Sequence, residues 1–129
     1  MRALRFLALI SGMLLAVLGA AGTATAAPAA AAAGGGYAAP TQVYCKLNVR
    51  ANATTSSAIV RTLYNRNGSC AGSSGHDSIP CWIASCTGVI TGSSYTCTTG
   101  GSSYNTWLPV NNGGTRAWVA IKCGTYVLP

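Results

Sequence analysis

The sequence has 129 residues and carries eight lysine or arginine residues against one carboxylate, Asp77, and one histidine, His76. A glycosidase that works through paired carboxylates needs two acidic side chains, and a calcium cage built from oxygen ligands needs several. Both classes are therefore excluded, and a single histidine also excludes a His-rich catalytic zinc site. The length predicts one domain, and the expectation that remains is a small, basic, cysteine-containing binding module.

Residues 1–26 have the pattern of a secretory signal peptide. Two arginines precede an apolar run over residues 6–21, and Ala24-Thr25-Ala26 supplies the small side chains that a signal peptidase accepts. An uncleaved membrane anchor is the alternative, but the run is short for a span of about 20 residues. We expect cleavage before Ala27, secretion, and no membrane association afterwards. The remaining 103 residues carry six basic side chains and one carboxylate, which gives a net charge of +5.

Residues 27–41 consist mostly of alanine, glycine and proline around a single large side chain, Tyr37. Such a stretch has little to bury, which predicts a flexible linker. The folded unit is therefore expected over residues 42–129. At 88 residues, it is small enough for its hydrophobic core alone to be marginal.

All of the cysteines lie in this predicted folded unit, and there are six: Cys45, Cys70, Cys81, Cys86, Cys97 and Cys123. An even number in an exported chain predicts disulfides, here three, each stabilising the fold by about 2–5 kcal/mol. A zinc site is disfavoured because no C-x-x-C pair occurs. Many pairings are possible, and the one we predict joins Cys45 to Cys123. These residues belong to the first and last strand-like runs, which often meet in a small closed barrel.

The apolar residues follow the period of β-strands. Apolar and polar side chains alternate over residues 44–50, the pattern of a half-buried strand. The further strand-like runs are residues 58–64, 79–83, 89–91, 95–98, 106–110 and 115–121. The last two flank Asn111-Asn112-Gly113-Gly114, a strong hairpin signal. We predict an all-β fold, a small barrel with long loops over residues 65–78 and 92–105.

Several blocks of this sequence resemble the bacterial SH3-like (SH3b) domain, in particular its small secreted versions in actinobacteria. The blocks are KLNVRANATTSSAIVRTLY at residues 46–64, IPCWIASCTGVITG at 79–92, TWLPV at 106–110 and RAWVAIKCGTYV at 116–127. The resemblance implies a small barrel that binds cell-wall peptidoglycan or its peptides. Two departures stand out: the Ser-Gly-Pro turn of the family is Ala51-Asn52-Ala53 here, and both predicted loops are long.

Sites for peptides and sugars use flat apolar faces with a few polar groups. On this basis the candidate ligand-binding residues are Tyr64, Trp82, Tyr104, Trp107, Trp118 and Tyr126, together with Arg50. Packing in a small core is the alternative role for Trp107 and Trp118, whereas Tyr104 is expected in an exposed loop. Lys46, Asn48 and Arg50 share one face of the first predicted strand, which either meets an anionic partner or is simply solvated.

His76 and Asp77 form the only pair that suggests acid–base chemistry, but adjacent loop residues rarely converge on one substrate atom. We therefore expect no enzyme, no catalytic residue, no metal and no cofactor. Nucleic-acid binding is disfavoured because the charge of +5 includes no dense basic run. Two hypotheses remain open. One is a secreted, monomeric module that binds cell-wall glycan or extended peptides. The other is a diffusible cationic effector, such as an antimicrobial protein or a protease inhibitor.

Overall fold

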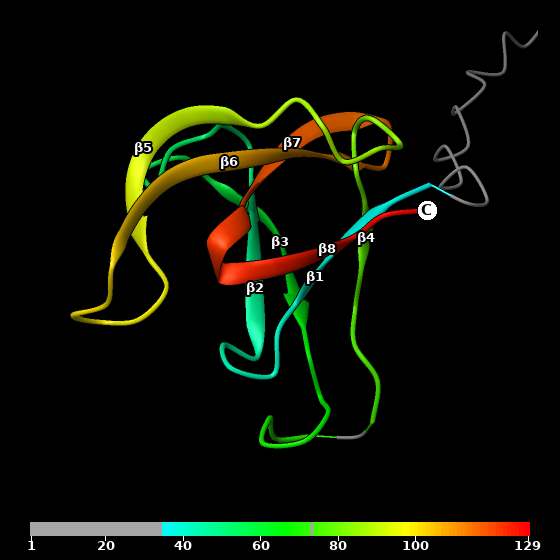
Figure 1. Ribbon diagram of the computed structural model, residues 1–129, viewed down its shortest axis with the longest axis vertical. Coiled ribbons are helices and arrows are strands. Elements are labelled where there is room, and N and C mark those ends of the chain that lie inside the picture. The colour runs from blue at the N-terminus through cyan, green and yellow to red at the C-terminus, as the bar shows by residue number, and fades with distance from the viewer. Residues whose placement is uncertain (1–34, 73) are drawn as a thin grey trace, which may run out of the picture.

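The computed structural model describes residues 35–72 and 74–129, so the predicted signal peptide and residues 27–34 of the predicted linker lie outside it. The described chain is all-β, as predicted, with its strands in two sheets and one short 3-10 helix, η1 (Ile121–Cys123) (Figure 1). Over these two ranges, no helix is long and apolar enough to cross a membrane.

The larger sheet has five antiparallel strands in the order β3-β2-β7-β6-β5. Its strands are β2 (Lys46–Arg50), β3 (Ile59–Tyr64), β5 (Ile90–Thr96), β6 (Ser103–Asn112) and β7 (Thr115–Ala120). The β2–β3 hairpin and the β5–β6–β7 meander are joined by a short ladder between β2 and β7, which pairs Val49 with Val119 and Arg50 with Trp118. This joint determines which side chains of the two halves of the chain become neighbours.

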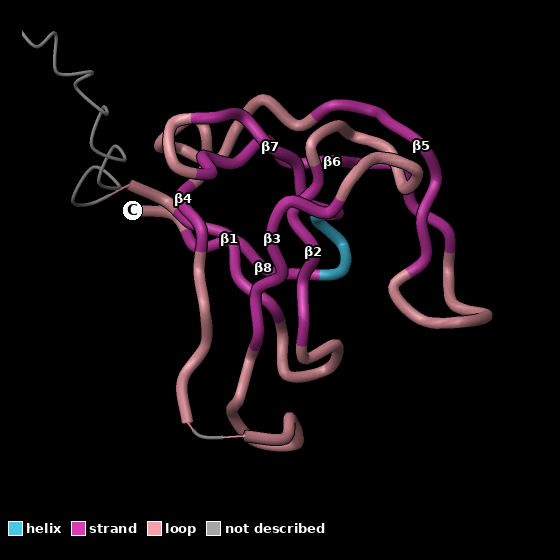
Figure 2. Tube along the Cα trace, turned by 180° about the vertical axis from the view of Figure 1, so that it is seen from behind, coloured by secondary structure: helices cyan, strands magenta, loops and turns pink. Residues whose placement is uncertain are grey.

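The smaller sheet has three strands in the order β4-β1-β8. They are β1 (Tyr37–Pro40), β4 (Ile79–Pro80) and β8 (Gly124–Val127). In Figure 1, β1 and β8 run diagonally across β2 and β3, and Figure 2 shows the same crossing from behind. Among the described residues neither sheet is closed into a barrel.

The core lies where the two sheets face each other. It is a single cluster of buried side chains: Ala38, Leu47, Val49, Leu63, Ile79, Cys81, Cys86, Leu108, Val110, Ala117 and Val119. Alternate residues of β2, β6 and β7 enter this cluster, because successive side chains of a strand point to opposite faces of its sheet. The polar residues of β2 are therefore left on the other face.

The predicted linker is wrong at its C-terminal end. β1 pairs with β4 on one side and with β8 on the other, and Ala38, Ala39 and Pro40 are buried. The Asn65 Nδ2 atom also donates a hydrogen bond of 3.1 Å to the Pro40 carbonyl oxygen. The folded unit therefore includes residues that precede 42, because alanine side chains are small enough to fit a central strand against the core.

The predicted hairpin is confirmed, whereas one predicted loop is mostly wrong. Asn112 pairs with Thr115 across a two-residue turn, and Gly113 and Gly114 have φ angles of 64° and 89°, as the turns typical of tight hairpins require. The predicted loop over residues 92–105 is instead occupied largely by β5 and β6, leaving only residues 97–102 as the connection. Ser94, Thr96 and Ser103 occupy exposed strand positions, so the composition of this stretch resembled that of a loop.

Three disulfides are present, as predicted, and they join Cys45 to Cys70, Cys81 to Cys86 and Cys97 to Cys123. The predicted pairing of Cys45 with Cys123 is wrong. β2, which begins directly after Cys45, does pair with β7, but η1 follows β7 and carries Cys123, which is bonded to Cys97 instead. Three disulfides indicate a chain that folds in an oxidising environment.

Reduction of the three disulfides is expected to unfold the domain. Two of the bridges span 25 and 26 residues, and loops of this length contribute about 3–4 kcal/mol each by restricting the unfolded chain. Such losses exceed what a core of this size can offset. Near-ultraviolet circular dichroism before and after reduction and alkylation measures the effect, and an unchanged spectrum would contradict the prediction.

Candidate binding groove

A groove of about 340 Å³ lies between the polar face of β2 and the β5–β6 hairpin. Figure 2 shows this hairpin extending to one side of β2 and β3. The groove is lined by Tyr44, Lys46, Leu47, Asn48, Arg50, Thr55, Tyr95, Thr96, Cys97, Trp107, Ala120 and Cys123. It is thus bounded by cations on one side and by hydroxyl groups and a disulfide on the other.

The cationic wall comes from alternate residues of β2. Lys46 is exposed, and Arg50 is half-buried, with its Nη1 atom donating a hydrogen bond of 2.8 Å to the Ser57 carbonyl oxygen. Asn48 accepts a hydrogen bond of 3.1 Å from the Thr62 hydroxyl. In the described part of the chain, the sole ion pair joins Arg66 to Asp77. Lys46 and Arg50 are therefore available to an anion from solution.

The floor of the groove is aromatic and rigid. Trp107 is 1% exposed, and its Nε1 atom donates a hydrogen bond of 2.9 Å to the Ser93 carbonyl oxygen. Its ring meets that of Tyr95 edge to face, with centroids 5.1 Å apart. A Cβ atom at Gly92 would overlap the indole ring, so the β5 backbone lies directly against it. Trp107 therefore supports the groove from below and offers little surface to a ligand.

The other predicted ligand-binding residues are dispersed. Tyr104 is exposed on β6, with its ring centroid 6.1 Å from that of Tyr95, and Trp118 is half-buried beside Arg50 in the β2–β7 ladder. Trp82, Tyr64 and Tyr126 lie elsewhere. Trp82 is covered by the Arg116 guanidinium at 4.8 Å from its ring centroid. Tyr64 and Tyr126 line two separate hollows of about 340 and 390 Å³. The structure thus places Arg50 and Trp107 in the groove and Trp118 and Tyr104 next to its residues.

Sequence reasoning missed two residues that shape the groove. Tyr95 is buried, and its hydroxyl donates a hydrogen bond of 2.6 Å to the Thr106 carbonyl oxygen. Thr55 ties the loop after β2 to β5, because its N–H donates a hydrogen bond of 2.8 Å to the Ser93 hydroxyl oxygen. The strand-like run at residues 95–98 was a weak signal for Tyr95. Nothing in the sequence indicated the contact of Thr55, which joins residues 38 positions apart.

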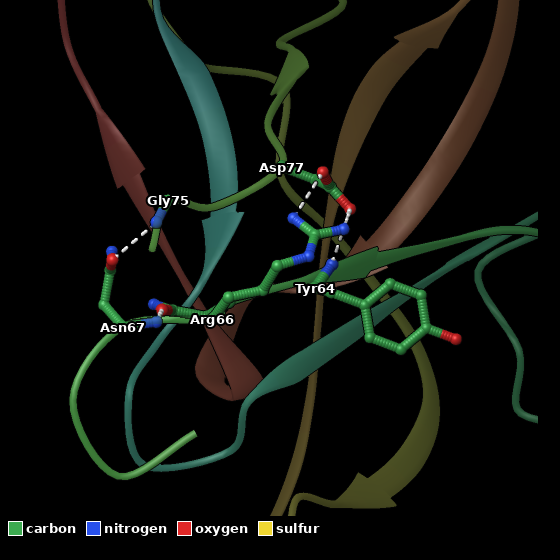
Figure 3. A network of polar contacts seen from close by, with 6 residues as sticks. Tyr64, Arg66, Asn67, Gly75 and Asp77 are labelled. Atoms are coloured by element: carbon green, nitrogen blue, oxygen red, sulfur yellow. Dashed lines mark hydrogen bonds and ion pairs between the residues drawn. The ribbon is translucent and has the colours of Figure 1, made fainter. Parts of the chain in front are cut away.

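His76 and Asp77 do not line the groove, and Figure 3 shows Asp77 beside Arg66 and Tyr64. Asp77 accepts hydrogen bonds from Arg66 at 3.1 Å and from the Tyr64 N–H at 3.0 Å. The hydrogen bond from Arg66, followed by that from Tyr64, holds the pKa of Asp77 below its ordinary value. His76 is exposed and forms a backbone bridge with Asn65. Over the described ranges, no three His, Cys, Asp or Glu side chains gather where a metal could bind.

Comparisons of this chain with protein-family models, with curated proteins and with solved structures found no match. A binding site is therefore inferred from the geometry and charge of the groove itself. The SH3b resemblance stays a prediction from the sequence blocks.

Replacing Trp107 with alanine is expected to lower the free energy of unfolding by about 3–5 kcal/mol, because it empties a fully buried site and removes the hydrogen bond to Ser93. The matched change Tyr104→Ala should cost only about 1 kcal/mol, since Tyr104 is exposed and its main aromatic contact is with Tyr95. Urea unfolding measures both. Equal losses would argue against the supporting role of Trp107.

Acid is expected to weaken the fold through Asp77. Its lowered pKa means that the ion pair stabilises the folded state fully above the ordinary carboxyl pKa of 3.8, and that this contribution is lost as the pH falls through the lowered value. The partners are 36% and 31% exposed, so the effect should stay below about 1 kcal/mol.

Urea midpoints measured between pH 6 and pH 2 for the unmodified protein and for Asp77→Asn provide the check. The two stabilities should converge at low pH, where Asp77 is protonated and resembles asparagine. A constant difference across this range would contradict the assignment.

Proposed function

We propose that this chain is an exported, non-catalytic binding module of the SH3-like type, and that it recognises cell-wall peptidoglycan or extended peptides through the groove beside β2. Support for the type comes from the strand pattern and the sequence blocks of the first subsection. Support for export comes from the signal-peptide pattern and the three disulfides.

The observation that carries the proposal is the pair of cations on β2 for which the described residues provide no carboxylate partner. Lys46 and Arg50 are four residues apart on one strand, which separates their Cα atoms by about 13 Å. An extended ligand that carries anionic groups along its length can contact both. The peptides of peptidoglycan have this character, since they are extended chains that carry carboxylates.

The opposite wall offers groups that suit such a ligand. Thr55 and Thr96 are exposed and line the groove, and each hydroxyl can donate to a carbonyl oxygen or accept from an amide N–H. Tyr44 adds an aromatic side chain near Lys46. Cations, hydroxyls and an aromatic side chain along one groove are typical of a site that holds a polar chain in a fixed direction.

Co-sedimentation with purified bacterial cell walls tests the proposal. Protein starting at Ala27 should be retained at moderate salt. Lys46→Gln and Arg50→Gln should each weaken retention about fivefold, because one exposed charge contact contributes about 1 kcal/mol.

Lys122→Gln is the matched control, since it removes the same charge from an exposed lysine on η1 that does not line the groove. It should leave retention within about twofold of the unmodified protein. Equal losses for Lys46→Gln and Lys122→Gln would show attraction by overall charge alone. Absence of retention for the unmodified protein would overturn the proposal.

A further inference from the structure

The outer edge of β3 is open. β3 is an edge strand of the larger sheet, and among the strands of residues 35–72 and 74–129 it pairs only with β2. The main chain of Tyr64 points away from β2, because its N–H donates to the Asp77 carboxylate at 3.0 Å and its carbonyl oxygen accepts the Asp77 N–H at 2.8 Å (Figure 3). Main-chain groups alternate in direction along a strand. Those of Thr62 therefore also point outward, and the described residues provide no partner for them.

A short segment of the chain already uses this edge as a strand would. Residues 75–77 run antiparallel to residues 64–66, with hydrogen bonds from the Arg66 N–H to the Gly75 carbonyl oxygen and from the Asp77 N–H to Tyr64, both 2.8 Å. The chain then leaves the edge for β4. The acidic residue of this segment, Asp77, pairs with an arginine of the same edge, Arg66. This segment indicates that an added strand should run antiparallel to β3 and carry negative charge.

The side chains along the open part of the edge are unusually apolar for a surface, apart from one cation. On the open part, Ile59 and Val60 are 49% and 45% exposed, and Tyr64, where Asp77 already occupies the edge, is 47% exposed. Arg61 is exposed, and the chain has no second carboxylate to pair with it. Thr62 and Tyr64 share one face of the sheet and Arg61 lies on the other. A strand added here would suit alternating apolar and acidic side chains.

A second copy of this chain brings no carboxylate to Arg61 at this edge. Antiparallel pairing of two β3 strands around Arg61 would place the two guanidinium groups directly opposite each other, and like charges in that position destabilise a ladder. Pairing around Thr62 would place each Arg61 opposite Leu63 of the other copy, which leaves both cations without a carboxylate. The register shift between Val49 and Arg50, which leaves Val60 of β3 without a partner on β2, also interrupts a long self-complementary edge. The occupant must therefore bring negative charge.

We propose that the edge of β3 binds an extended acidic peptide of another protein as a sixth strand. The peptide runs antiparallel to β3, continues the line of residues 75–77, hydrogen-bonds to the main chain of Thr62 and directs a carboxylate at Arg61. This mode, in which a peptide extends a sheet edge, draws affinity from main-chain hydrogen bonds and specificity from alternate side chains. It goes beyond the function proposed above because it uses a different surface from the β2 groove.

The probe is an eight-residue peptide of alternating valine and glutamate with blocked termini, titrated against the protein starting at Ala27 while amide shifts are recorded by NMR. The shifts should centre on Arg61, Thr62 and the neighbouring residues of β3. Arg61→Gln should weaken binding about fivefold. Two N-methylated versions of the peptide serve as controls, each methylated at alternate residues. Only one set of alternate N–H groups faces β3 in the bound peptide. Only the version that is methylated on this set should therefore lose binding.

Two variants of Thr62 separate main-chain from side-chain effects. Thr62→Pro removes the outward N–H and should weaken binding more than tenfold, whereas Thr62→Val keeps that N–H and should bind as the unmodified protein does. The methylated peptides give the same information without any change to the protein, should Thr62→Pro fail to fold.

Absence of shifts along β3, or equal binding of both methylated peptides, would overturn the proposal. Shifts confined to Lys46 and Arg50 would assign the peptide to the groove and would overturn it as well. Self-association without peptide, measured by sedimentation, would show that a second copy is the occupant. Arg61→Gln should be retained on cell walls as the unmodified protein is, since the groove does not include Arg61. Failure of the edge proposal can thus be told apart from failure of the groove proposal.

Discussion

The fold depends on a short ladder between β2 and β7. Only Val49 with Val119 and Arg50 with Trp118 are paired there, yet this contact joins the N-terminal hairpin to the C-terminal meander. Val49 and Val119 are fully buried, so burial of apolar surface reinforces the few hydrogen bonds. Because the pairing fixes the register, it also fixes which residues face the β5–β6 hairpin. The groove exists because this ladder orients β2 with its cations toward Tyr95 and Trp107.

The larger sheet carries two different kinds of packing on its two faces. One face packs against β1 and the rest of the smaller sheet through aliphatic side chains. The other carries Trp107 and Tyr95, whose polar atoms are satisfied by main-chain carbonyl oxygens of residues 93 and 106. Buried aromatic groups with such partners are held in one orientation. The aromatic face therefore supplies a fixed floor beside the cationic side chains of Lys46 and Arg50.

The sequence predicted the fold where burial differs between alternate residues, and it failed where burial differs little. The alternation around Leu47 and Val49 and the two glycines after Asn112 were sufficient for β2 and for the β6–β7 hairpin. β1 was missed because the contrast between alanines on its two faces is too small to show a period. The pairing of Cys97 with Cys123 depends on the position of the turn at η1, and the pattern of hydrophobic residues does not encode that position. Of the site, Arg50 was identified from its strand face, whereas Thr55 was not, because its contact with β5 is non-local.

The scarcity of carboxylates connects the groove with the β3 edge. The one acidic side chain is bound at Arg66, so Lys46, Arg50 and Arg61 have no carboxylate to pair with, which costs little because Lys46 and Arg61 are exposed and Arg50 is hydrogen-bonded to Ser57. Their attraction for a distant anion is screened within about 8–10 Å at physiological salt. Charge alone therefore attracts many anions weakly and selects none of them. Selection must come from strand geometry: the spacing of cations along β2 in the groove, and the direction of the Thr62 main chain at the edge.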